Sequence, residues 1–122
     1  MKKTVKFENS KIWKKSRELS TNIYWITNYE TFKDDITLQD QIRGAGNAVM
    51  FSIAKACNSR EVQNYLKYLD HALGFIAEVQ SALYIAIDQK YLEIEDFEEV
   101  YDMSSDISDS IMSLIDQANF PS

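Results

Sequence analysis

The chain has 122 residues, of which 45% are hydrophobic and 26% are charged, and its formal net charge is −6. This length suits one domain with one core, and the composition is that of a globular protein, which argues against a disordered or membrane-spanning chain. Three glycines and one proline are too few turn residues for an all-β fold. We therefore predict an all-α protein, an antiparallel up-down four-helix bundle that occupies residues 1–122 as a single domain.

The first ten residues are charged and no apolar run follows them, which argues against a secretory signal peptide. No stretch approaches the ~20 apolar residues that a membrane-spanning helix needs. Cys57 is the one cysteine, so no internal disulfide can form. These features predict a cytoplasmic protein without a membrane partner.

The first predicted helix spans residues 11–29. Its apolar residues recur every three or four positions, from Ile12 to Ile26, and so form one stripe along a helix. Ser10 is the predicted N-cap, because a serine hydroxyl can accept a hydrogen bond from a free amide of the first turn.

Residues 30–36 are predicted to connect this helix to a second one, at residues 38–58. Thr37 is the predicted N-cap, and Asp40 is expected in the first turn, where a carboxylate suits the helix dipole. The second helix is unusually rich in glycine and alanine. Because glycine lowers helix stability, we expect this helix to pack tightly on more than one side.

The third predicted helix spans residues 60–91, with Ser59 as a candidate cap, and it has two apolar stripes. The spacing of the first stripe is typical of a bundle seam. The first stripe comprises Val62, Leu66, Leu69, Leu73, Ile76, Gln80, Leu83 and Ile87. The second stripe comprises Tyr65, Tyr68, Ala72, Phe75, Val79, Ala82 and Ala86.

Two interpretations of the second stripe stay open. It can pack against a neighbouring helix of the same bundle, or it can form a subunit interface. Its aromatic residues, Tyr65, Tyr68 and Phe75, favour an interface. On the outward face, Gly74 would let a neighbouring chain approach, and Glu78 would be a polar anchor at that contact.

The fourth predicted helix spans residues 95–118, before Pro121, and the charges of the two chain ends differ. Residues 1–17 hold seven basic residues and one acid, whereas residues 88–116 hold ten acids and one base. The two helix faces can be solvated and complementary, or the basic face can bind a polyanion. The candidate nucleic-acid-binding residues are Lys11, Lys14, Lys15, Arg17 and Arg43.

The sequence lacks the residues of familiar catalytic and metal sites. His71 is the one histidine, whereas a di-metal bundle site and a histidine-based triad each need further partners. We expect His71 to be solvated and Cys57 to be a small buried apolar residue. The prediction is therefore a protein that is not an enzyme, with no catalytic residues, metal or cofactor.

Three segments carry a family resemblance: Trp13–Leu19, Leu38–Arg43 and Tyr65–Glu78. They resemble the 23S ribosomal RNA intervening-sequence proteins, which are four-helix-bundle proteins, over about residues 7–118. The chain is also similar to the accessory variability determinant proteins of diversity-generating retroelements, which bind nucleic acid. At the position after Arg43, the family has a second arginine where this chain has Gly44.

The resemblance implies a bacterial, cytoplasmic bundle that assembles with itself as a ring-shaped homopentamer, with no established biochemical role. The accessory proteins imply an alternative, binding of RNA or DNA. The absence of the second arginine and the net charge of −6 lower that expectation, since phosphate-backbone binding depends on clustered Lys and Arg.

Overall fold

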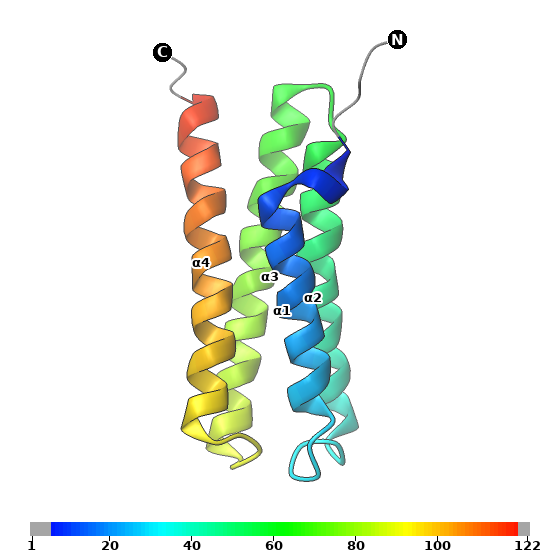
Figure 1. Cartoon of the computed structure of the whole chain (residues 1–122), viewed down its shortest axis with the longest axis vertical. Coiled ribbons are helices and arrows are strands. Elements are labelled where there is room, and N and C mark those ends of the chain that lie inside the picture. The colour runs from blue at the N-terminus through cyan, green and yellow to red at the C-terminus, as the bar shows by residue number, and fades with distance from the viewer. Residues whose placement is uncertain (1–5, 120–122) are drawn as a thin grey trace.

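The computed structural model describes residues 6–119, so Lys2, Lys3 and Pro121 lie outside the described residues. A short 3-10 helix, η1, precedes four α-helices. The α1–α2 and α3–α4 connections lie at one end of the molecule and the α2–α3 connection lies at the other (Figure 1). Each helix contacts the next one along the chain, and α4 closes against α1. The predicted antiparallel four-helix bundle is confirmed, with η1 at Phe7–Asn9, α1 at Lys11–Thr27, α2 at Ile36–Cys57, α3 at Val62–Asp88 and α4 at Ile94–Asn119.

Of the three predicted N-caps, the structure confirms one. The hydroxyl of Ser10 accepts a hydrogen bond from the amide of Trp13 at 3.3 Å, as expected. Thr37 does not cap α2, because the helix begins earlier and the amide of Leu38 donates to Asp35 Oδ1 at 3.0 Å. Asp40 consequently lies beyond the first turn.

The third predicted cap, Ser59, is also wrong. Its hydroxyl donates to the backbone carbonyl of Lys55 at 2.7 Å and so completes the end of α2. The N-cap position of α3 is Glu61, whose side chain makes no capping hydrogen bond. α3 therefore begins two residues later than the sequence predicted.

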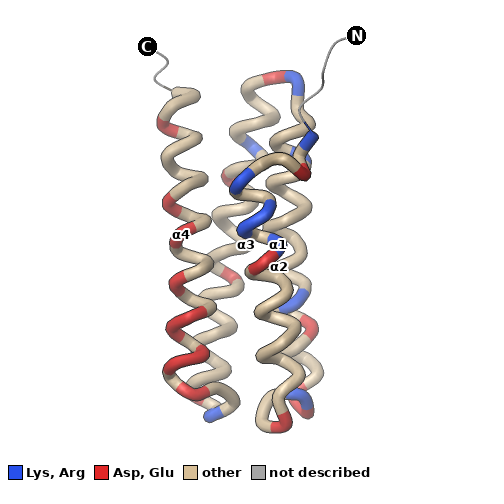
Figure 2. Tube along the Cα trace, in the orientation of Figure 1, with Lys and Arg blue, Asp and Glu red and all other residues tan. Residues whose placement is uncertain are grey.

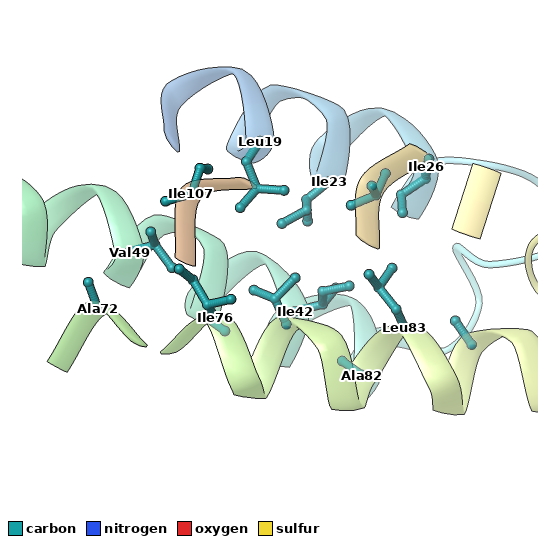
Figure 3. Close-up of a cluster of buried hydrophobic side chains, with 14 of the residues drawn as sticks. Leu19, Ile23, Ile26, Ile42, Val49, Ala72, Ile76, Ala82, Leu83 and Ile107 are labelled. Carbon is teal, nitrogen blue, oxygen red and sulfur yellow. The ribbon is translucent and has the colours of Figure 1, made fainter. Parts of the chain in front are cut away.

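The four helices enclose one apolar core, with the side chains of all four pointing toward its axis (Figure 3). Leu19, Ile23, Ile42, Leu83 and Ile107 are among the core residues with an exposed fraction of 1% or less. Burial of each such side chain contributes about 1.5–3 kcal/mol. The core therefore accounts for the one apolar stripe of α1. Of the predicted seam of α3, Leu69, Ile76 and Leu83 are buried in the core, whereas Val62 is 62% exposed.

The second stripe of α3 is divided between the core and the surface. Its small residues, Ala72, Val79, Ala82 and Ala86, are buried in the bundle core, and α3 has its most extensive contact with α2. For these four residues, packing within the bundle is the correct interpretation. The aromatic residues of the stripe, Tyr65, Tyr68 and Phe75, are only half-buried.

The glycines explain how closely the helices pack. A Cβ atom on Gly46 would lie 2.7 Å from Cδ1 of Ile23, whereas a Cβ atom on Gly44 or Gly74 would meet nothing within 4 Å. The expected tight packing of α2 thus holds where Gly46 faces α1. At Gly44 the surface of α2 is open.

A group of hydrogen bonds joins the two connections at one end of the bundle. The hydroxyl of Tyr91 donates to Asp35 Oδ2 at 2.9 Å, and Thr31 Oγ1 donates to the carbonyl of Tyr91 at 2.7 Å. Lys90 turns the chain before Tyr91 with a φ of 64°. We call Thr31, Asp35 and Tyr91 the clasp, because they tie the α1–α2 connection to the α3–α4 connection.

Candidate functional site

A hollow of about 620 Å³ lies between α2 and α3. A second hollow of about 400 Å³ continues along α3 past Gly74, and the two share Phe75 and Glu78. We call the two hollows together the α2–α3 groove. Its main features come from Asp40 and Gly44 of α2 and from Asp70, Gly74, Phe75, Glu78 and Ile85 of α3.

The α2–α3 groove combines negative charge with apolar surface. Asp40, Asp70 and Glu78 are exposed carboxylates of its lining, which includes no lysine or arginine. Within residues 6–119, no side-chain hydrogen bond or salt bridge engages these three carboxylates. Phe75 and Ile85 add apolar surface, and Ile85 is 47% exposed. The groove therefore suits a partner that carries cations beside an apolar side chain.

The structure brings together three of the five predicted interface residues. Gly74, Phe75 and Glu78 line the groove, and Glu78 is exposed, as expected of an outward-facing residue. Tyr65 and Tyr68 lie nearer the start of α3, outside the groove lining. These two tyrosines pack against the core from its edge.

Local contacts hold Tyr68 and Tyr65 in place. The ring of Tyr68 lies edge to face with the ring of His71, with centroids 5.8 Å apart. The Nζ atoms of Lys55 and Lys67 lie 5.7 and 4.8 Å from the Tyr68 centroid. Burial raises the pKa of the Tyr65 hydroxyl, and the nearby Cys57 thiol raises it further. Tyr68 therefore has aromatic and cationic neighbours within the chain, and Tyr65 packs half-buried against the core.

Four of the five candidate nucleic-acid-binding residues form a basic patch on the first half of α1. Lys11, Lys14, Lys15 and Arg17 are all exposed, and Lys and Arg gather near the start of α1 in Figure 2. The guanidinium of Arg17 lies 5.9 Å from the ring centroid of Trp13. We call these four residues the basic patch.

Arg43, the fifth candidate, lies apart and is half-buried between α1 and α2. Its guanidinium carbon lies 4.6 Å from the ring centroid of Tyr24, and its Nε donates to Thr27 Oγ1 at 2.8 Å. Arg43 thus helps to hold α2 against α1, a role that its charge alone did not indicate.

Opposite charges of the molecule lie on adjacent helices without pairing. Asp and Glu recur along α4, next to the basic patch of α1 (Figure 2). Among residues 6–119, the one salt bridge joins Lys33 to Glu30 in the α1–α2 connection, at 3.0 Å. The expected complementarity of the basic and acidic faces therefore produces no ion pair within the described chain.

Sequence reasoning missed the exposure of Trp25, which is 71% exposed on α1. The position of this residue could have indicated it, because Trp25 follows Lys14 by eleven residues, about three helical turns, and so shares its outward face. It also missed an aromatic cluster across α3 and α4, in which the ring centroids of Tyr84, Phe97 and Tyr101 lie 5.0–5.8 Å apart. That cluster forms only when α3 packs against α4, so the sequence of either helix alone does not indicate it.

The expectation that Cys57 is buried is wrong. Cys57 is exposed, because it is the last residue of α2, one position beyond the buried Ala56. His71 is exposed, as predicted. Within the described range, 6–119, no group of three His, Cys, Asp or Glu side chains lies close enough to hold a metal ion.

None of the helices within residues 6–119 combines the length and the apolar character needed to cross a membrane.

Comparisons with known proteins agree with this architecture. One solved structure is similar to this chain with a TM-score of 0.79 and 22% sequence identity, over 85% of this chain and 97% of the other. It is a protein with unknown function from the S23 ribosomal protein family from Bacteroides thetaiotaomicron. No curated protein matches the chain. The sequence profile of the 23S rRNA-intervening sequence protein family matches residues 8–113, and the chain therefore belongs to the 23S rRNA-intervening sequence protein family.

Proposed function

We propose that this protein is a non-enzymatic, homo-oligomeric bundle that acts as a binding or scaffold module, with the α2–α3 groove as a subunit interface. The assembly that we expect is a ring of five subunits in the bacterial cytoplasm, as the family resemblance implies. The observation that carries the proposal is the groove itself, in which Gly74, Phe75 and Glu78 lie together across from Gly44.

The two open glycines support this proposal. Glycine inside a helix costs about 0.5–1 kcal/mol of stability relative to alanine. At Gly44 and Gly74, a Cβ atom would meet nothing within 4 Å in the described chain, so no contact within the chain requires glycine there. A second molecule that approaches the helix backbones would account for both. Phe75 and Ile85 would then lose the rest of their exposure, and an exposed apolar patch beside polar groups is typical of a protein interface.

The molar mass in solution tests the proposal. Sedimentation equilibrium at micromolar concentration is expected to give a multiple of the 14.1 kDa chain mass. Gly74→Gln fills the groove from an exposed helix position, so we expect it to lower the mass toward that of one chain. A monomeric wild-type protein would overturn the proposal.

Gly74→Ala is the milder companion variant in this experiment, and we expect it to weaken the assembly less than Gly74→Gln. It removes the same glycine but adds only a methyl group, and a Cβ atom at position 74 has open space within the chain. A loss of assembly in Gly74→Gln with an unchanged circular dichroism spectrum would locate the interface in the groove. Assembly that survives Gly74→Gln and Gly44→Gln would place the interface elsewhere.

A second candidate function, binding of RNA or DNA, is favoured by the basic patch. Its four cations are exposed at one end of the bundle and form no salt bridge within residues 6–119. The relation to the accessory variability determinant proteins, which we propose from the resemblance, points the same way. Titration of structured RNA and duplex DNA at two salt concentrations tests it, because phosphate binding weakens steeply with salt. Saturable binding that Lys14→Gln/Arg17→Gln abolishes would support it, whereas no binding at low salt would exclude it.

A further inference from the structure

We propose that the α2–α3 groove binds the outer face of α1 from a second copy of this chain, with the basic patch and Trp25 as the contacting groups. The inference rests on the proposed function, which makes the groove a subunit interface without naming what fills it. The contact joins two different surfaces of neighbouring copies, so it is a heterologous contact between bundles that stand side by side.

Charge complementarity selects this occupant. The groove presents Asp40, Asp70 and Glu78 without cationic partners. Within the basic patch, Lys14 and Arg17 lie together beside Trp13 on the outer side of α1, whereas Lys11 and Lys15 lie beside α4. No salt bridge engages Lys14 or Arg17 within residues 6–119. A second copy that brings the patch to the groove satisfies both sets of charges, and complementary charge fixes the register of such a contact.

The apolar groups match as well. Trp25 is 71% exposed and lies on the same outward face of α1 as Lys14. The groove offers the half-buried Phe75 and the 47% exposed Ile85. Tryptophan and arginine are enriched among the residues that dominate binding energy at interfaces. This contact explains why so large an apolar side chain stays outside the core.

The lengths and levels of the two surfaces also agree. The face of α1 from Lys11 to Trp25 is ~21 Å long, and the groove from Asp70 to Ile85 on α3 is ~22 Å long, at 1.5 Å per residue. α1 and α3 run in the same direction and end toward the same end of the bundle (Figure 1). Arg17 lies ten residues before the end of α1, and Glu78 lies ten residues before the end of α3.

Trp25 and Ile85 also lie at similar levels along the bundle, since they lie two and three residues before the ends of α1 and α3. A second copy that stands beside the first in the same orientation therefore brings Arg17 and Trp25 within about one helical turn of the levels of Glu78 and Ile85. Gly44 and Gly74, with open space at their Cβ positions, let the incoming helix approach the groove.

A charge-swap experiment tests the pairing. Variant A carries Lys14→Glu and Arg17→Glu, and variant B carries Asp70→Lys and Glu78→Lys, the groove carboxylates nearest the level of these two cations. Each variant alone places like charges on the patch and the groove, so each is expected to be monomeric at concentrations at which the wild type assembles. In an equimolar mixture each contact between A and B has opposite charges, so the two variants are expected to form mixed oligomers. A closed ring of five cannot alternate A and B, so the expected readout is a mass above that of one chain.

Controls separate this inference from a general effect of charge. Arg60→Glu and Glu98→Lys reverse exposed charges outside the groove and the patch, and both variants should assemble like the wild type. Trp25→Ala should raise the dissociation constant by about tenfold or more, the size expected for a central interface residue. Circular dichroism checks that every variant keeps its helical fold.

The outcomes distinguish the two proposals. A monomeric wild type would overturn the proposed function and this inference together. An assembled wild type that Gly74→Gln disrupts, combined with variants A and B that each assemble alone, would overturn this inference and leave the groove as an interface with another occupant. A mixture of A and B that stays monomeric would also overturn it.

Discussion

Gly44, Gly46 and Gly74 all lie within helices, yet their surroundings differ enough to predict opposite responses to alanine. At Gly44 and Gly74 a Cβ atom has open space, whereas at Gly46 it would meet the fully buried Ile23 at 2.7 Å. Ile23 is held on all sides by the core, and interiors at native packing density tolerate added volume poorly.

We therefore expect Gly44→Ala and Gly74→Ala each to raise the free energy of unfolding by about 0.5–1 kcal/mol. Gly46→Ala gains the same helix propensity but forces Ile23 to move, and it should be less stable than Gly44→Ala by about 1–3 kcal/mol. Urea unfolding of the three variants measures the order. Equal stability of all three would contradict the close contact between α1 and α2 at Gly46.

Arg43 shows what a sequence cannot reveal at the residue scale. Its positive charge made it a candidate for nucleic-acid binding, but its partners, Tyr24 and Thr27, lie on α1, more than fifteen residues away. Asn47 extends this contact, because its amide donates to the Tyr24 hydroxyl at 2.9 Å and accepts from Ser20 at 2.7 Å. Only the packing of α1 on α2 determines which polar residues find such partners.

At the scale of the elements, periodicity predicted all four helices, because apolar residues three and four positions apart lie on one face of a helix. It left open what covers the second stripe of α3, whose small residues are buried in the core and whose aromatic residues are half-buried. The ends of the helices were harder to predict. At the start of α2, for example, Asp35 and Thr37 are both good capping residues and lie two positions apart. The α2–α3 groove was unpredictable as a shape. It depends on where the side chains of two helices leave space, although Gly74 and Glu78 were identified from their outward position.

The start of α2 gives a prediction at this scale. Asp35→Ala should lower the free energy of unfolding by about 0.5–2 kcal/mol, because it removes the cap of Leu38, and the loss of the Tyr91 hydrogen bond should add to the effect. Thr37→Ala, two residues later, should change stability by less than about 0.5 kcal/mol, as at an ordinary exposed position. Thermal unfolding of both variants measures the difference, and a larger effect of Thr37→Ala would show that the helix begins later.

At the scale of the whole molecule, we expect the Tyr91 hydroxyl of the clasp to make the free energy of unfolding decrease at alkaline pH. The hydrogen bond to Asp35 raises the pKa of the Tyr91 hydroxyl above its ordinary value of 10.0, and burial and the charge of Asp35 raise it further. A raised pKa means that the folded state favours the protonated phenol. Its contribution is therefore fully present below pH 10 and is lost as the pH rises through the pKa of the folded state.

We expect the free energy of unfolding to fall above about pH 10, and to fall less steeply in Tyr91→Phe, which has no hydroxyl to ionise. Tyr29, Tyr65 and Tyr101 also have raised pKa values, so part of the decline should remain in the variant. Denaturant unfolding between neutral and alkaline pH measures both slopes. Identical slopes for the variant and the wild type would mean that the Tyr91 hydroxyl is free in solution.

The position of the clasp has a consequence for how the molecule opens. The hydrogen bonds between the two connections lie at one end of the bundle, whereas the start of α1 and the end of α4 lie at the other (Figure 1). Local opening begins where the fewest contacts must break. Amide protons of the first turns of α1 and the last turns of α4 should therefore exchange with deuterium first. Protection of the amide protons from exchange should increase toward Asp35 and Tyr91, because local unfolding starts at the opposite end of the bundle.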